Sequence, residues 1–449
     1  MLFFAVAPSV QGGGKPPLTP CGAGLCGTLT VPVDRSAPNG STIPIQFEVI
    51  PAERPAYRGR QALVLLNGGP GSPARDMSSF AMSHFYDVWQ THDILLFDQR
   101  GTGTDRLYCP SPGTVGYDSP AAAVTVYWTT CLKTLGVDPN TYTTAVTMHD
   151  LDDVRAALGY QKLDLYGISY GATAAQYYLL MYPEHVRTAI LDAGSRLDTP
   201  TFEHWGQNAQ RVLDALFARC AKDASCHKAF PAPAKDLRTV LARLAQSPAT
   251  VNGWRITAPA FAFAVQALSD QPDTAAALPF LLHRATTRGV GLVASEVELR
   301  TYLPTVQLMT WAILCGEPWA RFDPARLAAF DAGSYLAAAD AAVFGFTRAT
   351  CAAFPPYHDV AGAEGPVRSN VPALWLVGSS DPLSPLRDVA GVNAAMPNAK
   401  VVVVHGAGHG SLDVGCTTTI ANTFVLRGTI KSINTSCATK TPYPGFRLR

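Results

Sequence analysis

A serine flanked by two glycines is the first group in this chain that could do covalent chemistry. The sequence GISYG at residues 167–171 follows the apolar run 163–166 and precedes an alanine-rich segment. A tight turn from a strand into a helix strains the serine backbone, and the flanking glycines remove side chains that would clash. The hydroxyl then lies at a helix N-terminus, which favours developing negative charge. This context predicts Ser169 as a nucleophile, the alternative being an ordinary glycine-rich turn.

A serine hydroxyl is a weak nucleophile near neutral pH and needs a neighbouring base. With this type of elbow the acid and then the histidine follow the serine along the chain. Asp381 follows the apolar run 373–377, and His409 lies in a glycine-rich loop after the VVVV run. The order predicts Ser169, Asp381 and His409 as a catalytic triad. The rival residues are His405, which lies nearer the strand end and is expected to be structural, and the acidic alternatives Asp388, on a predicted helix, and Asp413.

A second glycine-rich loop, NGGPG at residues 67–71, directly follows the apolar run 62–66. Such a loop brings a backbone N–H close to the carbonyl group under attack. We expect the N–H groups of Gly69 and Tyr170 to form an oxyanion hole. The alternative is a simple turn at the end of a strand.

The elements that must position these groups are short apolar runs that alternate with helical patterns. Continuous apolar runs are typical of strands buried on both faces. Alternation with helices predicts an α/β fold with a mostly parallel sheet and helices on both faces. The expected strands are residues 27–33, 43–50, 62–66, 93–97, 163–166, 186–191, 373–377 and 401–404, and the expected helices include 148–158, 172–181 and 385–395.

This alternation stops between residues 191 and 373, where the chain is rich in alanine and leucine with apolar residues at helical spacing, as in 202–221 and 234–245. An insertion of this size predicts a large helical cap over the carboxyl edge of the sheet, where open α/β sheets place their sites. The expected organisation is an N-terminal tail (1–26), a first core segment (27–195), the cap (196–368) and a second core segment (369–449).

Composition limits the classes of partner. The chain has 449 residues, of which 47% are hydrophobic and 15% charged, with a net charge of +1. It has no run of lysine and arginine, so neither nucleic acid nor an acidic membrane surface is an expected partner. No segment reaches the roughly 18 apolar residues of a membrane span. The short apolar start LFFAVA (2–7) is interpreted as the remnant of a signal peptide, the alternative being an apolar start without function.

Ten cysteines fall in local pairs, and an even number of closely spaced cysteines favours disulfides in an oxidising compartment. The alternative is ten reduced, mostly buried thiols. The spacings do not match a zinc site, and no metal or cofactor is expected. A secreted or periplasmic location follows. Sequence does not fix connectivity, and the simplest assignment is Cys21–Cys26, Cys109–Cys131, Cys220–Cys226, Cys315–Cys351 and Cys416–Cys437.

Taken together, the motifs resemble the proline-iminopeptidase and tripeptidyl-aminopeptidase family of α/β hydrolases. The matching segments are NGGPG (67–71), DQRGTG (98–103), the Ser169 elbow, Asp381, GHG (408–410), CGTLTVPVD (26–34), CAKDASC (220–226) and AILCGE (312–317). The last three, with residues 369–449, resemble the secreted tripeptidyl branch. The resemblance implies a secreted serine aminopeptidase of tripeptidyl or prolyl type that acts on peptide or small acyl substrates. The residues that flank the glycine loop differ from the usual family pattern. The resemblance therefore supports the reaction class more than the exact substrate.

The resemblance also places an acidic residue, Glu317, near the site, held by a disulfide from Cys315. A buried ammonium must be paired, so an aminopeptidase needs a carboxylate in its cap. Glu317 is therefore predicted to bind the substrate amine, with solvated surface charge as the alternative. Weaker candidates are Glu203, Glu296 and Glu298.

Two other functions compete with the peptidase. A carboxylesterase or acyl hydrolase would use the same triad without needing a cap carboxylate. A non-enzymatic interaction protein on a hydrolase scaffold would not need the complete order of serine, aspartate and histidine. Arg100 is expected to tie loops together, and if buried it requires a carboxylate partner.

Overall fold

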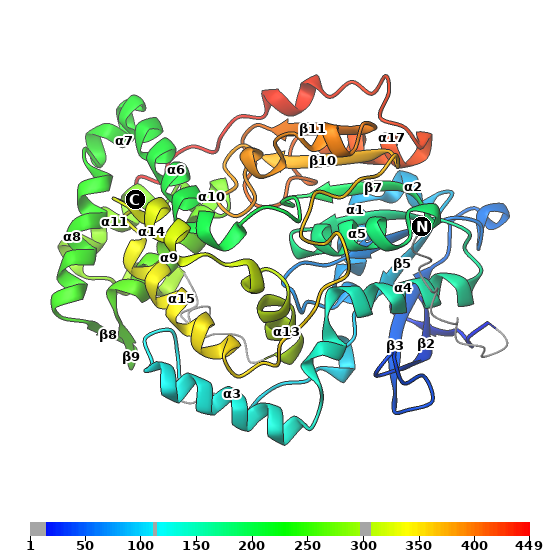
Figure 1. Ribbon diagram of the computed structural model, residues 1–449. Coiled ribbons are helices and arrows are strands. Elements are labelled where there is room, and N and C mark those ends of the chain that lie inside the picture. The colour runs from blue at the N-terminus through cyan, green and yellow to red at the C-terminus, as the bar shows by residue number, and fades with distance from the viewer. Residues whose placement is uncertain (1–14, 111–114, 297–306) are drawn as a thin grey trace.

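The computed structural model describes residues 15–110, 115–296 and 307–449. Its centre is a nine-stranded sheet in the order β1-β2-β3-β5-β4-β6-β7-β10-β11 (Figure 1). The pairs from β5 to β11 are parallel, whereas β1, β2 and β3 run antiparallel to their neighbours. The predicted α/β class with a mostly parallel sheet is confirmed. The strands are β1 Thr19–Cys21, β2 Gly24–Pro32, β3 Thr42–Ile50, β4 Ala62–Leu66, β5 Asp93–Phe97, β6 Leu163–Ile168, β7 Val186–Asp192, β10 Ala373–Gly378 and β11 Ala399–Val404.

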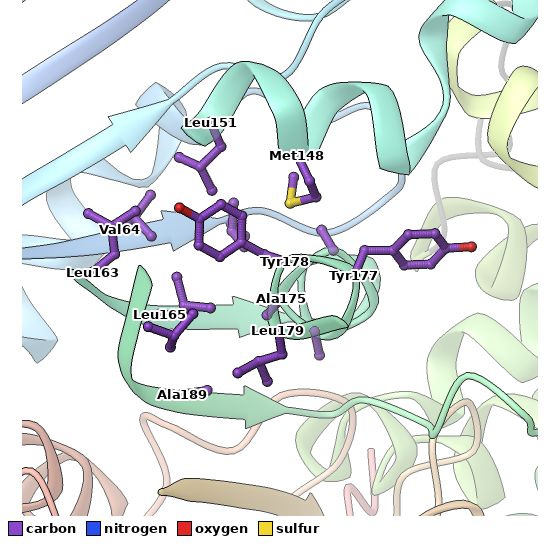
Figure 2. Packing of buried hydrophobic residues seen from close by; sticks show 14 of the residues in the cluster. Val64, Met148, Leu151, Leu163, Leu165, Ala175, Tyr177, Tyr178, Leu179 and Ala189 are labelled. Atoms are coloured by element: carbon purple, nitrogen blue, oxygen red, sulfur yellow. The ribbon is translucent and has the colours of Figure 1, made fainter. Parts of the chain in front are cut away.

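Strand β4 is apolar throughout because both faces of the sheet are covered. Val64 and Leu66 belong to the hydrophobic cluster under α4 and α5, and the alternate residues Leu63 and Leu65 belong to the cluster on the opposite face. Figure 2 shows Met148 and Leu151 of α4 packing toward the sheet above α5. The helices of the core are α1 Ser78–His84, α2 Tyr86–Trp89, α4 Thr144–Leu158, α5 Tyr170–Met181 and α17 Thr417–Arg427.

One predicted helix, 385–395, is wrong. The segment forms a 3-10 turn at Leu386–Val389 and a single helical turn, α16, at Val392–Ala395. Gly391 separates them with a φ of +76°, a left-handed conformation that interrupts a right-handed helix. Asp388 consequently lies in the 3-10 turn.

The segment between β7 and β10, called the insertion below, is mainly helical and has its own hydrophobic cluster, which includes Leu213, Leu237, Phe261 and Leu281. Figure 1 shows it beside one end of the sheet. Its described elements are α6 Thr201–Lys222, α7 Ala224–Ala229, α8 Pro233–Gln246, β8 Ala249–Val251, β9 Trp254–Ile256, α9 Ala258–Ser269, α10 Pro272–Ala275, α11 Leu278–Arg288, α12 Gly291–Glu296, α13 Leu308–Gly316, α14 Pro324–Asp331 and α15 Ala337–Cys351.

Helix α3 (Ala121–Leu135) precedes the insertion in sequence but packs against it. Its Trp128 shares a cluster with Trp311 and Phe346, and the hydroxyl of Thr125 donates to the carbonyl oxygen of Ala349 at 2.8 Å. Figure 1 shows α3 alongside α15 and away from the sheet. Residues 121–135 fall within the first core segment expected from the sequence (27–195), although the helix that they form packs against the insertion.

The ten cysteines form five disulfides, and the pairing is the one expected from spacing. No helix in the described ranges combines the length and the apolar character that crossing a bilayer requires. The apolar start at residues 2–7 lies outside the described residues.

Candidate active site

The turn around Ser169 has the strained geometry that the sequence predicted. Strand β6 ends at Ile168 and α5 begins at Tyr170, and Ser169 between them has φ +56° and ψ −123°. Both flanking glycines are required by close approach: a β-carbon on Gly167 would lie 2.1 Å from the carbonyl oxygen of Gly171, and one on Gly171 would lie 1.9 Å from that of Leu66. No other residue type fits this turn without moving the backbone.

The structure brings Ser169, His409 and Asp381 into one hydrogen-bonded chain. Nε2 of His409 lies 2.8 Å from Oγ of Ser169, and Nδ1 lies 3.0 and 3.1 Å from the two carboxylate oxygens of Asp381. Asp381 is fully buried, and its Oδ1 also accepts the N–H groups of Leu383 at 2.7 Å and Ser384 at 2.9 Å. A carboxylate held this way fixes the imidazole with Nδ1 protonated and leaves Nε2 free to take a proton from the serine.

Charge around His409 favours its protonated form. Burial by itself lowers the pKa of His409, but the charge and hydrogen bond of Asp381 outweigh burial and raise the pKa above its usual 6.5. Asp270 and Asp192 add smaller effects in the same direction. A positively charged imidazolium at His409 would therefore be stabilised by three carboxylates, those of Asp381, Asp270 and Asp192.

Asp192, the last residue of β7, has a role that the sequence analysis missed. Its carbonyl oxygen accepts the N–H of Ser169 at 2.9 Å, and its carboxylate accepts the N–H groups of Ser411 and Leu412 and the hydroxyl of Tyr166. Burial raises the pKa of Asp192 to about 6. A polar residue that ends the apolar run 186–191 was the signal in the sequence that could have identified it.

The rival residues lie elsewhere. Nδ1 of His405 contacts the carbonyl oxygen of Thr441, which fits the structural role expected for this histidine. Asp388 is buried and accepts the hydroxyl of Ser195 at 3.1 Å, and Asp413 is exposed.

The glycine-rich loop after β4 lies against the elbow. A β-carbon on Gly68 would come 3.3 Å from Cβ of Ser169, so Gly68 lies directly against this serine. Gly69 is the next residue of the loop. The Asn67 side chain holds the loop by accepting the N–H of Gly68 at 2.8 Å and donating to the carbonyl oxygen of Pro73 at 2.9 Å. The N–H of Tyr170 is at the first position of α5, where a helix supplies no acceptor of its own.

Glu317 is buried at the C-terminal end of α13, close to the elbow but enclosed. Its two carboxylate oxygens accept the N–H and the hydroxyl of Thr144, at 2.7 and 2.8 Å, and that hydroxyl also lies 2.8 Å from the hydroxyl of Tyr170. The Thr144 hydroxyl therefore links this carboxyl to the side chain of Tyr170, the residue that follows Ser169. Burial raises the pKa of Glu317 to about 8, and the neighbouring Asp359 adds to the rise.

The weaker acidic candidates have other partners or positions. The Glu203 carboxylate accepts the N–H of Asp323 at 2.8 Å and a guanidinium N–H of Arg326 at 2.9 Å. Glu296 is exposed and pairs with Arg447 at 2.7 Å. Glu298 lies outside the described residues.

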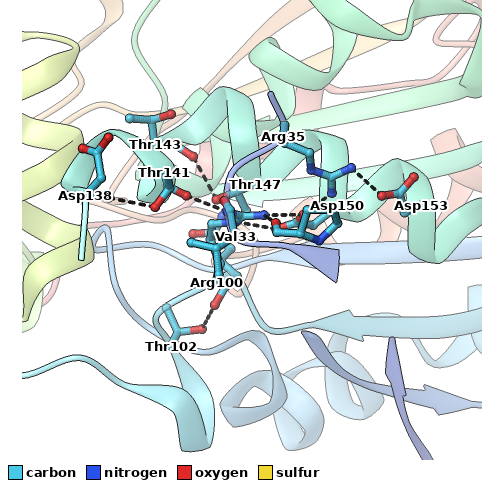
Figure 3. Close-up of polar contacts among 12 residues, drawn as sticks. Val33, Arg35, Arg100, Thr102, Asp138, Thr141, Thr143, Thr147, Asp150 and Asp153 are labelled. Atoms are coloured by element: carbon cyan, nitrogen blue, oxygen red, sulfur yellow. Dashed lines mark hydrogen bonds and ion pairs between the residues drawn. The ribbon is translucent and has the colours of Figure 1, made fainter. Parts of the chain in front are cut away.

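Arg100 is buried and has the carboxylate partner that the sequence analysis required. Its Nε and one terminal nitrogen donate to the two oxygens of Asp150 at 2.6 and 2.7 Å, and its other terminal nitrogen donates to the carbonyl oxygens of Val33 and Thr141 (Figure 3). The Asp150 carboxylate also pairs with Arg35. This network joins the β2–β3 turn, the loop after β5 and α4, and its contacts are structural.

Comparison with known proteins identifies the family of the chain. The model of the alpha/beta hydrolase fold family matches residues 61–415, from the start of β4 to beyond His409. The chain belongs to the α/β-hydrolase family. The resemblance to the proline-iminopeptidase and tripeptidyl-aminopeptidase family is also confirmed, because relatives with these names match the chain.

Three relatives and one solved structure are similar to this chain. The tripeptidyl aminopeptidase of Streptomyces coelicolor is 30% identical to this hydrolase over 188 residues, which are 37% of this chain and 34% of the relative. The serine protease Hip1 of Mycobacterium tuberculosis is 29% identical over 226 residues, 46% of this chain and 43% of that protein. The proline iminopeptidase of Xylella fastidiosa is 30% identical over 129 residues, 29% of this chain and 31% of the relative. The match thus spans less than half the length of each relative. The solved structure of the proline iminopeptidase of Mycobacterium smegmatis aligns with 89% of this chain and 98% of its own, with a TM-score of 0.37 and 16% identity.

Proposed function

We propose that this hydrolase cleaves amide bonds at or near a free N-terminus through an acyl-enzyme on Ser169. The observation that carries the proposal is the chain of hydrogen bonds from Ser169 through His409 to Asp381 at a strained elbow. Similarity to aminopeptidases and a serine protease supports a peptide substrate rather than another acyl compound.

In the proposed first step, Nε2 of His409 accepts the proton of Ser169 as Oγ attacks the carbonyl carbon of the scissile amide. The carbonyl oxygen becomes an oxyanion, and we propose that the N–H groups of Gly69 and Tyr170 receive it. The His409 imidazolium, stabilised by Asp381, then donates its proton to the leaving amine and the C–N bond breaks. In the second step His409 takes a proton from water, whose oxygen attacks the ester, and returns it to Ser169 as the acid product leaves.

We propose Glu317 as the group that recognises the substrate amine. Each carboxylate oxygen can accept more than one hydrogen bond, so the contacts with Thr144 leave acceptor capacity for an ammonium. With a pKa near 8, Glu317 carries little negative charge at neutral pH when its surroundings hold no cation, and an arriving ammonium favours its ionised form. The carboxyl group of Asp359, which accepts the hydroxyl of Tyr177, is close enough for its charge to act on Glu317.

The test compares Glu317→Gln with wild type on a tripeptide p-nitroanilide carrying a free amino group and on its N-acetylated counterpart. The expected result is a loss of kcat/KM on the free-amino substrate of about 10- to 100-fold, with little change on the acetylated one. The matched control is Glu296→Gln, which changes an exposed carboxylate paired with Arg447.

Two results would count against the assignment. Equal wild-type rates on both anilides would favour the carboxylesterase or acyl-hydrolase alternative. Equal losses on both anilides in Glu317→Gln would mean that Glu317 only fixes the start of α4 through Thr144.

We further propose that the protein works in the oxidising environment outside the cytoplasm, as a secreted or periplasmic enzyme. Five disulfides support this location, because reducing compartments do not maintain such bonds. We also propose that the chain divides after residues 26, 195 and 368, and that the insertion forms a cap over the site.

A further inference from the structure

The loop that carries His409 is held from outside the sheet by the turn between α9 and α10 of the insertion. The peptide N–H of His409 donates to the carbonyl oxygen of Asp270 at 2.8 Å. The side-chain amide of Gln271 donates to the carbonyl oxygen of His409 itself. Both polar groups of the His409 backbone therefore bond to two consecutive residues of the insertion.

Gly408 shows how closely the insertion approaches this loop. A β-carbon at residue 408 would lie 2.1 Å from the carbonyl oxygen of Asp270 and 2.9 Å from Cδ of Pro272. Contacts this short do not occur in real structures, so the loop accepts the turn only because residue 408 has no side chain. The close contact with the insertion thus explains why the first residue of the GHG motif, Gly408, is a glycine.

The carboxyl group of Asp270 is part of the same contact. Its Oδ1 is buried and has no hydrogen-bond partner among the described residues, an arrangement that costs free energy unless a nearby positive charge compensates it. Burial raises the pKa of Asp270 to about 7, and the charge of His409 acts against that rise. The charged groups that face His409 are Asp381 from the loop after β10, Asp192 from the end of β7, and Asp270 from the end of α9.

We propose that Asp270 and Gln271 are positioning residues for His409: their backbone and side-chain bonds fix the imidazole over Ser169, and the Asp270 carboxylate stabilises the imidazolium. The inference rests on the proposed role of His409 as the base. If these contacts position His409, catalysis requires that the insertion is correctly packed against the loop of His409. A shift of the α9–α10 turn would break the hydrogen bonds and displace the histidine. Displacements of about 1 Å can cost about 100-fold in rate.

The experiment measures the pH dependence of kcat/KM with p-nitrophenyl acetate, a small ester that does not need amine recognition. Asp270→Asn keeps the shape and removes the charge, so its acid-limb midpoint should fall by about 0.5 to 1 pH unit, with activity at pH 8.5 within about threefold of wild type. The control is Asp273→Asn, an exposed carboxylate on α10, whose profile should match wild type.

Two further variants test the backbone contacts. Gln271→Ala should lower kcat by about 10-fold with KM within twofold, because the histidine loses one restraint while the substrate contacts remain. Gly408→Ala should lower kcat by about 100-fold or more, because the new methyl group separates the loop from Asp270. The rate at which a fluorophosphonate labels Ser169 should fall in parallel in both variants, and thermal unfolding of each variant separates these effects from loss of fold.

Unchanged acid-limb midpoints in Asp270→Asn together with wild-type kcat in Gln271→Ala would overturn the inference. A fall in unfolding temperature with an unmoved pH profile in Asp270→Asn would also overturn it, because the contact would then be structural only. Failure of the proposed function is distinguishable, since turnover would then persist in Ser169→Ala. If turnover still depends on Ser169 and either of these results is found, only the positioning role of Asp270 and Gln271 is contradicted, and the proposed function stands.

Discussion

The peptide N–H of Ser169 donates to the carbonyl oxygen of Asp192 at 2.9 Å, which connects the elbow to the end of the neighbouring strand. The carboxylate of the same aspartate accepts the N–H groups of Ser411 and Leu412, two and three residues beyond His409. One residue at the carboxyl edge of the sheet thus holds both the proposed nucleophile and the loop of the proposed base. Oγ of Ser169 and Nε2 of His409 lie 2.8 Å apart.

This arrangement predicts that Asp192→Asn impairs both stability and turnover. The asparagine amide group would face backbone N–H groups that now donate to a carboxylate, leaving buried donors without acceptors. We expect a loss of about 1–3 kcal/mol in stability and a kcat about 10-fold lower. Thermal unfolding and steady-state kinetics measure the two effects, with exposed Asp87→Asn as the control. An unfolding temperature and kcat equal to wild type would show that Asp192 does not anchor the loop.

Activity should rise with pH along a limb set by His409. The imidazole must be neutral to accept the Ser169 proton, and the nearby carboxylates raise the pKa of His409 above 6.5. The midpoint of the acid limb of kcat/KM should therefore lie above 6.5. Asp381→Asn should keep the fold and lower kcat by about 10⁴-fold, because the ring loses the carboxylate that fixes its tautomer. Near-wild-type activity in that variant would remove Asp381 from the triad.

The carboxyl groups of Asp331 and Asp340 in the insertion both lie close to Gly206 of α6, in a space that this glycine leaves open, and each affects the pKa of the other. Burial raises the pKa of Asp340 to about 8, with Asp331 adding to the rise. A carboxyl whose pKa is higher in the folded state stabilises the fold fully below its unfolded value near 4, and this stabilisation is lost as the pH rises toward 8.

Asp340→Asn removes this titration. The variant should resemble wild type near pH 4 and exceed it in unfolding temperature at pH 8, by an amount equivalent to about 1–3 kcal/mol. Asp331→Asn should act in the same direction because it removes the other half of the pair. Thermal unfolding across that pH range measures the effect, and parallel curves for wild type and Asp340→Asn would exclude a shared proton.

The parts of this site that depend on residues close together in sequence could be predicted from the sequence, and those that depend on distant residues could not. The elbow at Ser169 depends on neighbouring residues, Gly167 and Gly171, so the motif and its flanking elements identify it. The contact between His409 and Asp270 joins residues 139 positions apart, and no local pattern marks either as the partner of the other. The helix expected at 385–395 failed for a local reason, because Gly391 adopts a left-handed conformation that periodicity alone does not show.

The packing of α3 against α15 also could not be predicted from the order of elements along the chain. Trp128 and Phe346 meet because the chain returns to the same place after more than 200 residues. The amphipathic pattern of a helix tells which side is buried, but it does not name the surface that covers that side.

Thiol titration of the denatured, unreduced protein should find no free cysteine. All ten form disulfides, and loss of one such bond typically costs about 2–5 kcal/mol. Cys315→Ser with Cys351→Ser should lower the unfolding temperature and also weaken turnover of free-amino substrates, since Glu317 lies two residues from Cys315. Several free thiols per chain in the unreduced protein would contradict the proposed oxidising location.

The central claim is that Ser169 forms the acyl-enzyme, and covalent labelling tests it most directly. A fluorophosphonate should modify the active protein once, and mass spectrometry of the digested chain should place the adduct on Ser169. Ser169→Ala should take no label and lose about 10⁴- to 10⁶-fold in kcat. Turnover that persists in Ser169→Ala, or a label found on another residue of the active enzyme, would contradict the account.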